Sequence, residues 1–454
     1  MKKLNFKYVH FLGIGGVSQS ALAIILKSKG VFVSGSDRTE SERTKKLRSL
    51  GMDITINGVS DCIKRADVIV VSASIGDDDK ELILAKSLNK KILSRAEMLG
   101  LVASSYKKVI SIAGSHGKTT TTGMLAKVFI DAGFDPTVHI GGHMVEIKGN
   151  VRVGGNKYFI TEACEYVDSF LTLRSDASII LNVQSDHLDY FKNLNNIKKS
   201  FKKFALNTKK NGLIVYCGDD KNINFNFKKK VVSFSTNNFG VVEARNIKEY
   251  EKGKYKFDCY LLGMRLQTIK LGVYGKHNVL NALATICVAL EFGINLKIVK
   301  KSLYEFCGVK RRFERVGNVG GVEVIHDYAH HPTEIKATIE LAKRVCKKDV
   351  YVVFQPHTYS RTKLLINEFK TCFYGAKELL VYKVYEAREN PKDGVDEKCL
   401  AREVSMAGQL AFSFDDYEEM KKYLKTKLKP NDLLLILGAG DIESFANYYL
   451  MDKD

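Results

Sequence analysis

The residues best suited to phosphate chemistry follow a short apolar stretch at 108–113. There the sequence reads Gly114-Ser115-His116-Gly117-Lys118-Thr119-Thr120, and a long helix-like segment, 118–132, comes next. Glycines let backbone N–H groups approach a phosphate, a lysine neutralises the β- and γ-phosphates, and a threonine hydroxyl holds Mg²⁺. The strict pattern also has glycine at position 112, where this chain has Ile112. The loop therefore predicts a bound nucleoside triphosphate; an ordinary turn before a threonine-rich helix is the alternative.

A second glycine loop lies near the N-terminus. The apolar segment 8–12 runs into Gly13-Ile14-Gly15-Gly16, and Asp37 follows Gly15 by 22 positions. This spacing nearly reproduces the dinucleotide-binding pattern, with Ser18 where the third glycine belongs. Glycines and a helix N-terminus together favour a diphosphate, without saying which one. A tight turn whose glycines only allow close packing is the alternative.

Carboxylates and histidines collect just after predicted strands. Glu162 follows the segment 158–161, and the segment 177–182 leads to His187. Ligands gather at the carboxyl ends of strands in α/β sheets, and oxygen ligands with an occasional imidazole suit Mg²⁺ near phosphates. Taken alone, such carboxylates favour a loop or capping role, but after a phosphate loop they predict metal ligands. Beyond His116 and His187, helix capping competes with a site for four further histidines: His277, His330, His331 and His357.

The elements that would position these residues alternate along the chain. Apolar runs typical of buried strands are separated by helix-like stretches, which predicts parallel α/β sheets, with a hairpin region within 231–271. The strand–glycine-loop–helix unit restarts near positions 8, 108 and 321. We therefore predict an α/β protein of three domains: 1–104, Rossmann-like; 105–312, a P-loop ATPase-like domain with a mostly parallel sheet; and 313–454, Rossmann-like.

Composition excludes several classes of protein. The 454 residues are 45% hydrophobic and 27% charged, which is typical of globular chains and not of disordered or fibrous ones. The net charge of +20 suggests nucleic acid or another anionic ligand, but the lysine runs are scattered and lack interleaved aromatic residues, as on a solvated surface. Nine cysteines without a CxxC pair indicate reduced thiols. Early glycines interrupt any signal peptide and no apolar run reaches about 20 residues, so we expect a cytoplasmic protein without membrane insertion.

Together these stretches resemble the Mur ligase family. The matching motifs run in one order along nearly the whole chain: Gly13–Ala23, Ala113–Thr122, Glu162–Tyr166, Ser185–Phe191, Gly275–Ala284, Arg311–Gly317, Asp327–Ile335, Phe354–Thr362 and Gly438–Ile442. The resemblance implies ATP-dependent amide formation in peptidoglycan precursor synthesis. The lactyl carboxylate of UDP-N-acetylmuramate would attack the γ-phosphate of ATP, and the amine of L-alanine would then attack the acyl phosphate.

The resemblance also implies a role for each motif residue, with one domain each for UDP-sugar, ATP and amino acid. Lys118 would stabilise the transferred phosphoryl group. Mg²⁺, with Mn²⁺ as a substitute, would be held by Thr119 and Glu162, and a second ion by His187. ATP would be bound by Gly114, Ser115, His116, Gly117, Lys118, Thr119, Thr120, Asn278, Asn281 and Arg311. The UDP-sugar would be bound by Gly13, Gly15, Gly16, Ser72, Ser74 and Arg95, and the alanine and muramoyl carboxylate by Tyr328, His330 and Arg361. The catalytic set would be Lys118, His187, Glu162, His330 and Arg361.

The chain departs from the family pattern at three places. Many relatives have arginine where this chain has Thr358, an acidic residue in place of His326, and EADES where this chain reads EACEY from Glu162. The missing cation at position 358 leaves the recognition of the carboxylate open. Some members also use a carbamylated lysine, and Lys202 or Lys203 falls in the corresponding region without being assigned that role.

Three other functions compete with this interpretation. A recycling ligase that adds a whole peptide to UDP-N-acetylmuramate is not separated by the sequence, although Gly13–Ala23 favours alanine addition. An NAD(P)-dependent oxidoreductase leaves Lys118 unexplained. A nucleic-acid ATPase would need an acidic box and aromatic stacking platforms that the sequence lacks. We expect the small-molecule substrates UDP-N-acetylmuramate, L-alanine and ATP, no nucleic acid, and a monomer or homodimer.

Overall fold

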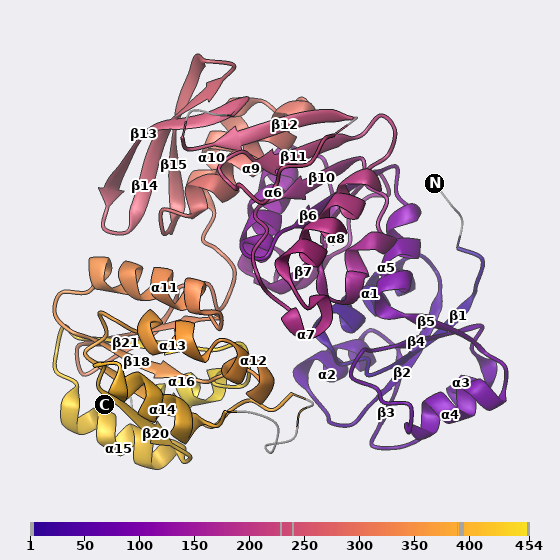
Figure 1. Cartoon of the computed structure of the whole chain (residues 1–454). Helices are drawn as coiled ribbons and strands as arrows, with labels where there is room; N and C mark the ends of the chain where they lie inside the picture. The colour runs from indigo at the N-terminus through magenta and orange to yellow at the C-terminus, as the bar shows by residue number, and fades with distance from the viewer. Residues whose placement is uncertain (1–3, 228, 238–239, 388, 390–394, 452–454) are drawn as a thin grey trace. The chain divides into compact units, whose positions relative to one another are not determined.

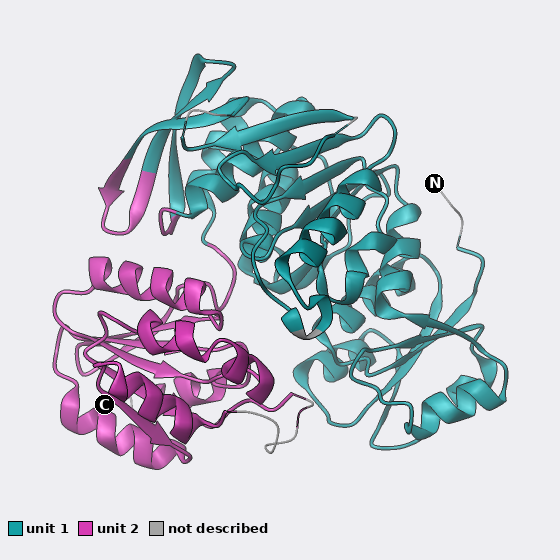
Figure 2. Ribbon diagram, viewed as in Figure 1, with its two compact units in different colours: residues 1–247, 256–272, 277–307 teal, residues 248–255, 273–276, 308–454 magenta. Residues whose placement is uncertain are grey.

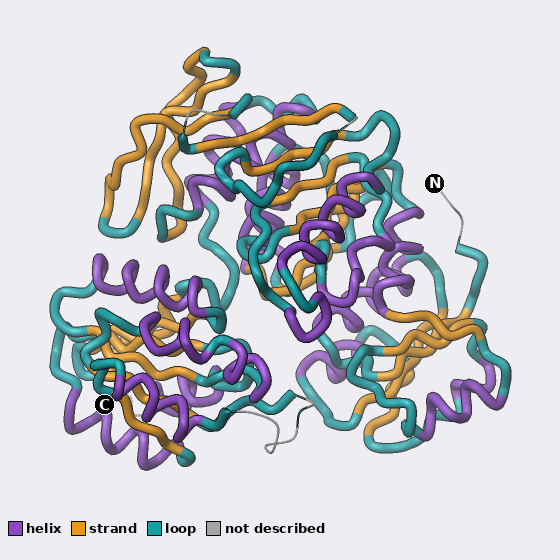
Figure 3. Tube along the Cα trace, in the orientation of Figure 1, coloured by secondary structure: helices purple, strands orange, loops and turns teal. Residues whose placement is uncertain are grey.

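The computed structural model describes residues 4–227, 229–237, 240–387, 389 and 395–451 (Figure 1). Their strands form three β-sheets, each accompanied by helices (Figure 3). The chain divides into two compact units (Figure 2): unit 1 comprises residues 1–247, 256–272 and 277–307, and unit 2 comprises 248–255, 273–276 and 308–454. Unit 1 contains the whole first sheet and most of the second, and unit 2 contains the third.

The first sheet has five parallel strands in the order β3-β2-β1-β4-β5. The order reverses at β1, and ligands in open α/β sheets bind beside such a reversal, at the carboxyl ends of the strands. The strands are β1 (Tyr8–Leu12), β2 (Phe32–Asp37), β3 (Asp53–Ile56), β4 (Val68–Val71) and β5 (Lys91–Ser94). The helices are α1 (Val17–Ser28), α2 (Glu42–Ser49), α3 (Cys62–Arg65), α4 (Lys80–Ser87) and α5 (Arg95–Ser104).

The second sheet has ten strands in the order β15-β14-β13-β12-β11-β10-β6-β9-β7-β8. Pairing is parallel from β13 through to β7, and β8 is antiparallel. The strands are β6 (Lys108–Ala113), β7 (Thr137–Met144), β8 (Gly149–Arg152), β9 (Tyr158–Glu162), β10 (Ala177–Ile180), β11 (Leu213–Cys217), β12 (Lys230–Ser235), β13 (Val242–Glu251), β14 (Lys254–Leu261) and β15 (Met264–Tyr274). The helices are α6 (Lys118–Asp131), α7 (Leu188–Phe191), α8 (Leu194–Leu206), α9 (Asn278–Glu291), α10 (Leu296–Glu305) and the short 3₁₀ helices η1 (Val145–Ile147) and η2 (Tyr166–Thr172).

The third sheet has six strands in the order β16-β17-β21-β18-β19-β20, parallel except for β16. The strands are β16 (Glu314–Val319), β17 (Val322–Asp327), β18 (Val350–Phe354), β19 (Glu378–Tyr382), β20 (Ala411–Phe414) and β21 (Leu433–Leu437). The helices are α11 (Pro332–Val345), α12 (Tyr359–Leu364), α13 (Ile366–Cys372), α14 (Glu397–Met406), α15 (Tyr417–Lys427) and α16 (Glu443–Leu450).

Central strands of the third sheet are buried on both faces, which explains their continuous apolar sequences. Along β18, Val352 and Phe354 pack in a core with α11, α13 and α14, whereas Tyr351 and Val353 pack in a second core with α15 and α16. Successive side chains of a strand point to opposite faces, so a strand covered on both sides must be apolar at every position.

The predicted fold class is confirmed: the protein is α/β, with three mostly parallel sheets. The predicted hairpin is also confirmed, because β14 and β15 are neighbours joined through Leu262 and Gly263, both with positive φ as in a type I′ turn. The predicted strand 177–182 ends early, at Ile180, since Asn182 turns to hydrogen-bond the loop after β6. The domain boundaries at 104/105 and 312/313 stay predictions.

Candidate functional sites

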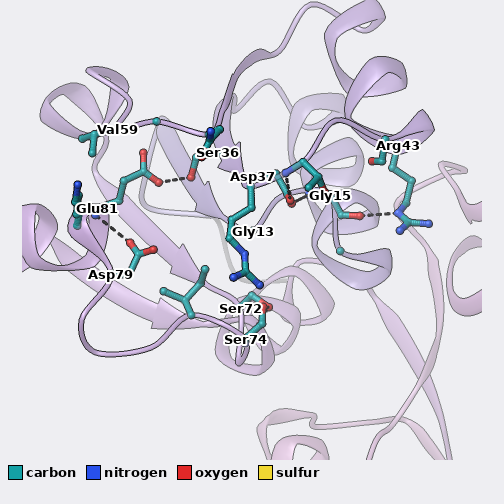
Figure 4. Close-up of a pocket in the computed structure, with 18 residues that line it drawn as sticks. Gly13, Gly15, Ser36, Asp37, Arg43, Val59, Ser72, Ser74, Asp79 and Glu81 are labelled. Atoms are coloured by element: carbon teal, nitrogen blue, oxygen red, sulfur yellow. Dashed lines mark hydrogen bonds between the residues drawn. The ribbon is translucent and has the colours of Figure 1, made fainter. Parts of the chain in front are cut away.

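A cavity of about 640 Å³ lies at the carboxyl ends of β1, β2 and β4 (Figure 4). Five of the six residues predicted to bind the UDP-sugar line it, namely Gly13, Gly15, Gly16, Ser72 and Ser74. Arg95 does not line it; its guanidinium Nη1 instead donates to Ser18 Oγ at 3.2 Å. The cavity therefore lies where the reversal of strand order predicts a ligand.

The glycine loop at this cavity already satisfies its own N–H groups. Gly13 and Ile14 each donate to Ser36 O at 2.9 Å, and Gly15 donates to Asp37 Oδ2 at 2.8 Å (Figure 4). A Cβ atom on Gly15 would lie 2.8 Å from the same carboxylate oxygen, so only glycine fits without a shift. The carboxylate that a dinucleotide-binding enzyme would aim at a ribose thus caps the loop instead, which argues against the NAD(P) alternative.

Positive charge at the cavity comes from side chains outside the loop. Arg43, from the first turn of α2, donates from Nε to Gly15 O at 2.5 Å and lines the cavity. Arg38 lines it too, and its guanidinium has no hydrogen bond or ion pair with any residue that the structure describes. The acidic lining residues are committed to the fold: Asp79 caps α4, and Glu81 accepts hydrogen bonds from β2 and from the turn before α3. The cavity therefore offers its two arginines to an anion.

The second glycine loop joins β6 to α6 and is held by its neighbours. Gly114 and Gly117 have φ of +148° and +86°, and a Cβ atom on Gly117 would lie 2.6 Å from Asn281 Oδ1. Asn182 clamps the loop from the end of β10, since its Oδ1 accepts from His116 N at 2.8 Å and its Nδ2 donates to His116 O at 3.1 Å. The structure thus brings together the predicted ATP residues of the loop and Asn281, which also donates to Asn278 Oδ1 at 2.8 Å.

Lys118 forms a buried ion pair in this loop. Its Nζ lies 3.0 Å from both carboxylate oxygens of Glu165, and it also donates to Gly114 O at 2.5 Å. The two side chains are 17% and 2% exposed. Burial by itself would lower the pKa of Lys118, but the Glu165 carboxylate outweighs it and raises the pKa, so the ammonium stays charged. The loop therefore contains a fixed cation whose present partner is an anion.

A group of possible metal ligands lies beside this ion pair. Ligand atoms of Glu165, Asp186 and His187 lie within 4.8 Å of one another. Two carboxylates and an imidazole suit a divalent cation such as Mg²⁺ or Mn²⁺. Glu162 lies outside this group and accepts a hydrogen bond from Gly141 N at 2.7 Å, and Thr119, the second residue of α6, has 8% of its surface exposed. Glu162 and His187 are the ligands predicted from the sequence; Glu165 and Asp186 stand in the same two strand-end stretches but were not given that role.

The residues predicted for the amino acid gather in unit 2. The rings of Tyr328 and His330 are 5.5 Å apart, those of His330 and His357 are 5.9 Å apart, and Arg361 Nη1 lies 3.5 Å from His357 Nδ1. His357 is an addition to the predicted set, and its position directly after β18 was the available signal. Thr358 has a φ of +68° and caps α12 without a side-chain hydrogen bond. The cluster thus has imidazole, phenol and guanidinium groups in mutual reach.

Arg311 also belongs to unit 2, whereas the other residues predicted for ATP belong to unit 1. It donates to Gly438 O and Gly440 O at 2.8 and 2.9 Å, and its guanidinium lies 4.8 Å from the Tyr328 ring centre. Asp327 accepts hydrogen bonds from the backbone N–H groups of Phe313 and Ala329, and burial raises the pKa of its carboxyl to about 6. Arg311 is therefore fixed beside the amino-acid cluster.

Among the described residues, no helix is both long and apolar enough to cross a membrane.

Three family models match successive parts of the chain. The Mur ligase family catalytic domain matches residues 8–107, the Mur ligase middle domain matches 112–289, and the Mur ligase glutamate ligase domain matches 311–440.

Individual relatives match the chain from end to end. It is 42% identical to the UDP-N-acetylmuramate–L-alanine ligase of Caldanaerobacter subterraneus, over 99% of this chain and 98% of the relative. It is 43% identical to the enzyme of the same name from Clostridium tetani, over 98% of both chains. The solved structure of UDP-N-acetylmuramate–alanine ligase MurC from Thermotoga maritima superposes with a TM-score of 0.83 at 30% identity, covering 98% of this chain and 99% of that one.

Proposed function

Because the chain belongs to the Mur ligase family, we propose that it is an ATP-dependent ligase that joins L-alanine to the lactyl carboxylate of UDP-N-acetylmuramate. The reaction would belong to peptidoglycan precursor synthesis in the cytoplasm. The observation that carries this proposal is that unit 1 holds two glycine loops with cations placed differently, one with a lysine in the loop and one with arginines lining the cavity beside it. Such a pair suits a triphosphate and a diphosphate bound by the same enzyme.

The UDP-sugar is assigned to the cavity of the first sheet. Arg38 and Arg43 would neutralise its diphosphate, assisted by the N-terminus of α1, which has no side-chain cap. A helix N-terminus carries a partial positive charge of about half a unit, and each charge-assisted hydrogen bond adds about 1.5–3 kcal/mol. This assignment extends the predicted set Gly13, Gly15, Gly16, Ser72 and Ser74 by the two cations.

ATP is assigned to the loop Gly114–Thr120, with Asn278 and Asn281 behind it. Lys118 would exchange Glu165 for the γ-phosphate, a more highly charged anion. Mg²⁺, which neutralises charge on the β- and γ-phosphates when bound, would be held by Thr119 with carboxylates from Glu162 or Glu165. His187 would contribute to a second ion.

The proposed reaction has two steps. The lactyl carboxylate attacks the γ-phosphorus in line, ADP leaves, and Lys118 stabilises the equatorial oxygens of the transferred group. The neutral amine of alanine then attacks the acyl carbon, and the tetrahedral intermediate expels phosphate. We assign the alanine carboxylate to Arg361 and the removal of an amine proton to His330, with Tyr328 lining the site.

Each of the three substrates is assigned to one of the three predicted domains. We propose that residues 1–104 bind the UDP-sugar, that 105–312 bind ATP and that 313–454 bind the amino acid.

The decisive experiment measures ADP release by the purified protein with UDP-N-acetylmuramate, ATP and Mg²⁺. L-Alanine, glycine, L-serine and a stem tripeptide are offered in parallel. We expect release that depends on L-alanine, with a product heavier than UDP-N-acetylmuramate by one alanyl residue. Faster turnover with the tripeptide would favour the recycling ligase, and no amine-dependent release at all would refute the proposal.

A further inference from the structure

A chain of side-chain hydrogen bonds runs through unit 1 from helix α5 to strand β9. Arg95 Nη1 donates to Ser18 Oγ at 3.2 Å, and Ser18 Oγ lies 2.8 Å from His139 Nε2. His139 Nδ1 lies 2.9 Å from Thr161 Oγ1, which in turn donates to the backbone carbonyl of Glu162 at 3.0 Å. His139 and Thr161 are only 4% and 0% exposed, so water does not compete for their bonds.

The bond that Thr161 donates to the Glu162 carbonyl sets the direction of the other bonds in this chain. Because the hydroxyl hydrogen of Thr161 is used on that carbonyl, its oxygen accepts, so His139 Nδ1 must carry the ring proton and donate it to Thr161 Oγ1. In a neutral ring Nε2 is then an acceptor for the hydroxyl hydrogen of Ser18, whose oxygen accepts from Arg95. Burial, with the nearby charge of Arg95, lowers the pKa of His139 to about 4, which keeps the ring neutral as this pattern requires.

Ser18 and Thr161, the two partners of the His139 ring, belong to elements that border the two substrate sites proposed for unit 1. Ser18 is in the first turn of α1, two residues after the cavity-lining Gly16. Thr161 and Glu162 end β9, the parallel neighbour of the strand β6 that leads into the ATP loop. Helix α1 also packs against β7 and β8. The hydrogen bonds thus connect a helix of the first sheet to the carboxyl edge of the second.

We propose that His139 is a positioning residue that holds the first turn of α1 in register with the end of β9. In doing so it sets the distance between the bound lactyl carboxylate and the γ-phosphate. The inference rests on the proposed function for its effect on turnover, but the hydrogen-bond order itself does not depend on it. A misplacement of about 1 Å between reacting groups costs about 100-fold in rate, so a loosened link affects the chemical step more than the binding of either substrate.

The first test reads the ring protons by ¹⁵N NMR of the full-length, histidine-labelled protein at neutral pH. We expect a protonated-type shift for Nδ1 of His139 and an unprotonated-type shift for Nε2, assigned by their loss in His139→Gln. The opposite tautomer, or a doubly protonated ring, would overturn the proposed chain whether or not the protein ligates alanine.

The second test separates positioning from folding and binding. In His139→Leu and in the nearly isosteric Thr161→Val, we expect kcat to fall by about 100-fold and about 10-fold. The dissociation constants of UDP-N-acetylmuramate and of a non-hydrolysable ATP analogue, each measured by calorimetry, should change by less than about threefold. His139→Gln should recover much of the lost kcat because its amide oxygen can accept from Ser18.

Thr208→Val is the matched control, because it removes a buried 2.8 Å hydrogen bond to Ser178 in the same sheet without touching this chain. We expect it to leave kcat unchanged. An equal loss of kcat in the control would overturn the proposal, as would unchanged turnover in both His139→Leu and Thr161→Val. Wild-type protein that binds both nucleotides but ligates no amine would refute the proposed function, while the ring tautomer would still decide the hydrogen-bond chain.

Discussion

The two glycine loops of unit 1 share a strand–loop–helix plan but differ in the source of their positive charge. In the N-terminal loop the N–H of Gly15 is capped by a carboxylate, and the cations are Arg38 and Arg43, which follow the loop in sequence and line the cavity beside it. In the second loop the cation, Lys118, belongs to the loop itself and is held by Glu165. Similar sequence patterns therefore place the positive charge beside one loop and within the other.

The difference indicates how each loop selects its ligand. A loop whose N–H groups are already paired gains little from enclosing a phosphate, so the proposed diphosphate would be bound by the cavity wall and the end of α1. A buried lysine paired with a carboxylate exchanges partners only for a strong competing anion, because an unpaired buried charge is costly. A triphosphate with its metal ion would meet that condition. Lys118 would then leave Glu165 only for a ligand that carries enough negative charge to replace it.

The largest expected effect comes from removing the loop cation. In Lys118→Ala the transferred phosphoryl group loses its main side-chain partner, and we expect kcat to fall by about 1000-fold. Steady-state ADP release measures this, and binding of UDP-N-acetylmuramate should change by less than about twofold. Lys127→Ala, in the same helix and paired with Asp131 and Glu305 outside the glycine loop, is the control. Near-normal turnover in Lys118→Ala would refute the assignment of ATP to this loop.

Removing an arginine of the cavity tests whether the diphosphate is bound beside the N-terminal loop. Arg43→Leu should raise the KM for UDP-N-acetylmuramate by about 30-fold through loss of a charge-assisted bond, and should leave the KM for ATP unchanged. Arg48→Leu, from the same helix, removes an exposed pair with Glu40 and a hydrogen bond to Ile54 O, neither of which belongs to a cavity-lining residue, and serves as the control. If both variants bind the UDP-sugar normally, the diphosphate lies elsewhere.

Replacing the carboxylate of Asp37, which caps the N-terminal loop, should have a smaller effect and should raise the affinity for the UDP-sugar instead of lowering it. Asp37→Asn keeps an acceptor for the Gly15 N–H but removes a negative charge next to the cavity. We therefore expect the affinity for UDP-N-acetylmuramate, measured by calorimetry, to rise by about threefold as repulsion is relieved. A large loss of affinity would mean that Asp37 contacts the ligand directly, which would break the contrast between the loops.

Sequence patterns within a short segment predicted those elements whose structure depends mainly on that segment. Strand 108–113 and the start of α6 at Lys118 were predicted to the residue, because a buried parallel strand and a glycine-lysine loop leave strong signatures. Tyr328, His330 and Arg361, which the resemblance assigns to one site, lie in one cluster in the structure, connected through His357. Their roles stay predictions.

Contacts between distant segments were not predictable in this way. Arg95 was assigned to the UDP-sugar, but in the structure it is bonded to Ser18, 77 positions away, and Ser18 is bonded to His139, 121 positions away. Glu165 stands three residues after the predicted ligand Glu162, and nothing in the spacing says which of the two faces Lys118. No helix or strand periodicity encodes such pairings, because they depend on how separate sheets pack.

The smallest expected effect concerns stability and the link between the two loops. Burial and the nearby Arg95 lower the pKa of His139 to about 4 in the folded protein, whereas in the unfolded chain it is about 6.5. Below pH 6.5 the unfolded state therefore binds the extra proton first, and stability falls as pH falls toward 4, by up to about 1.4 kcal/mol per pH unit. Denaturant unfolding at pH 7, 6 and 5 should show a shallower decline in His139→Gln than in the wild type. Thr161→Val, which keeps the imidazole, should retain the wild-type slope despite a lower stability at pH 7. Equal slopes in His139→Gln and the wild type would show that the ring is not held neutral, and the two loops would then lack the rigid connection inferred here.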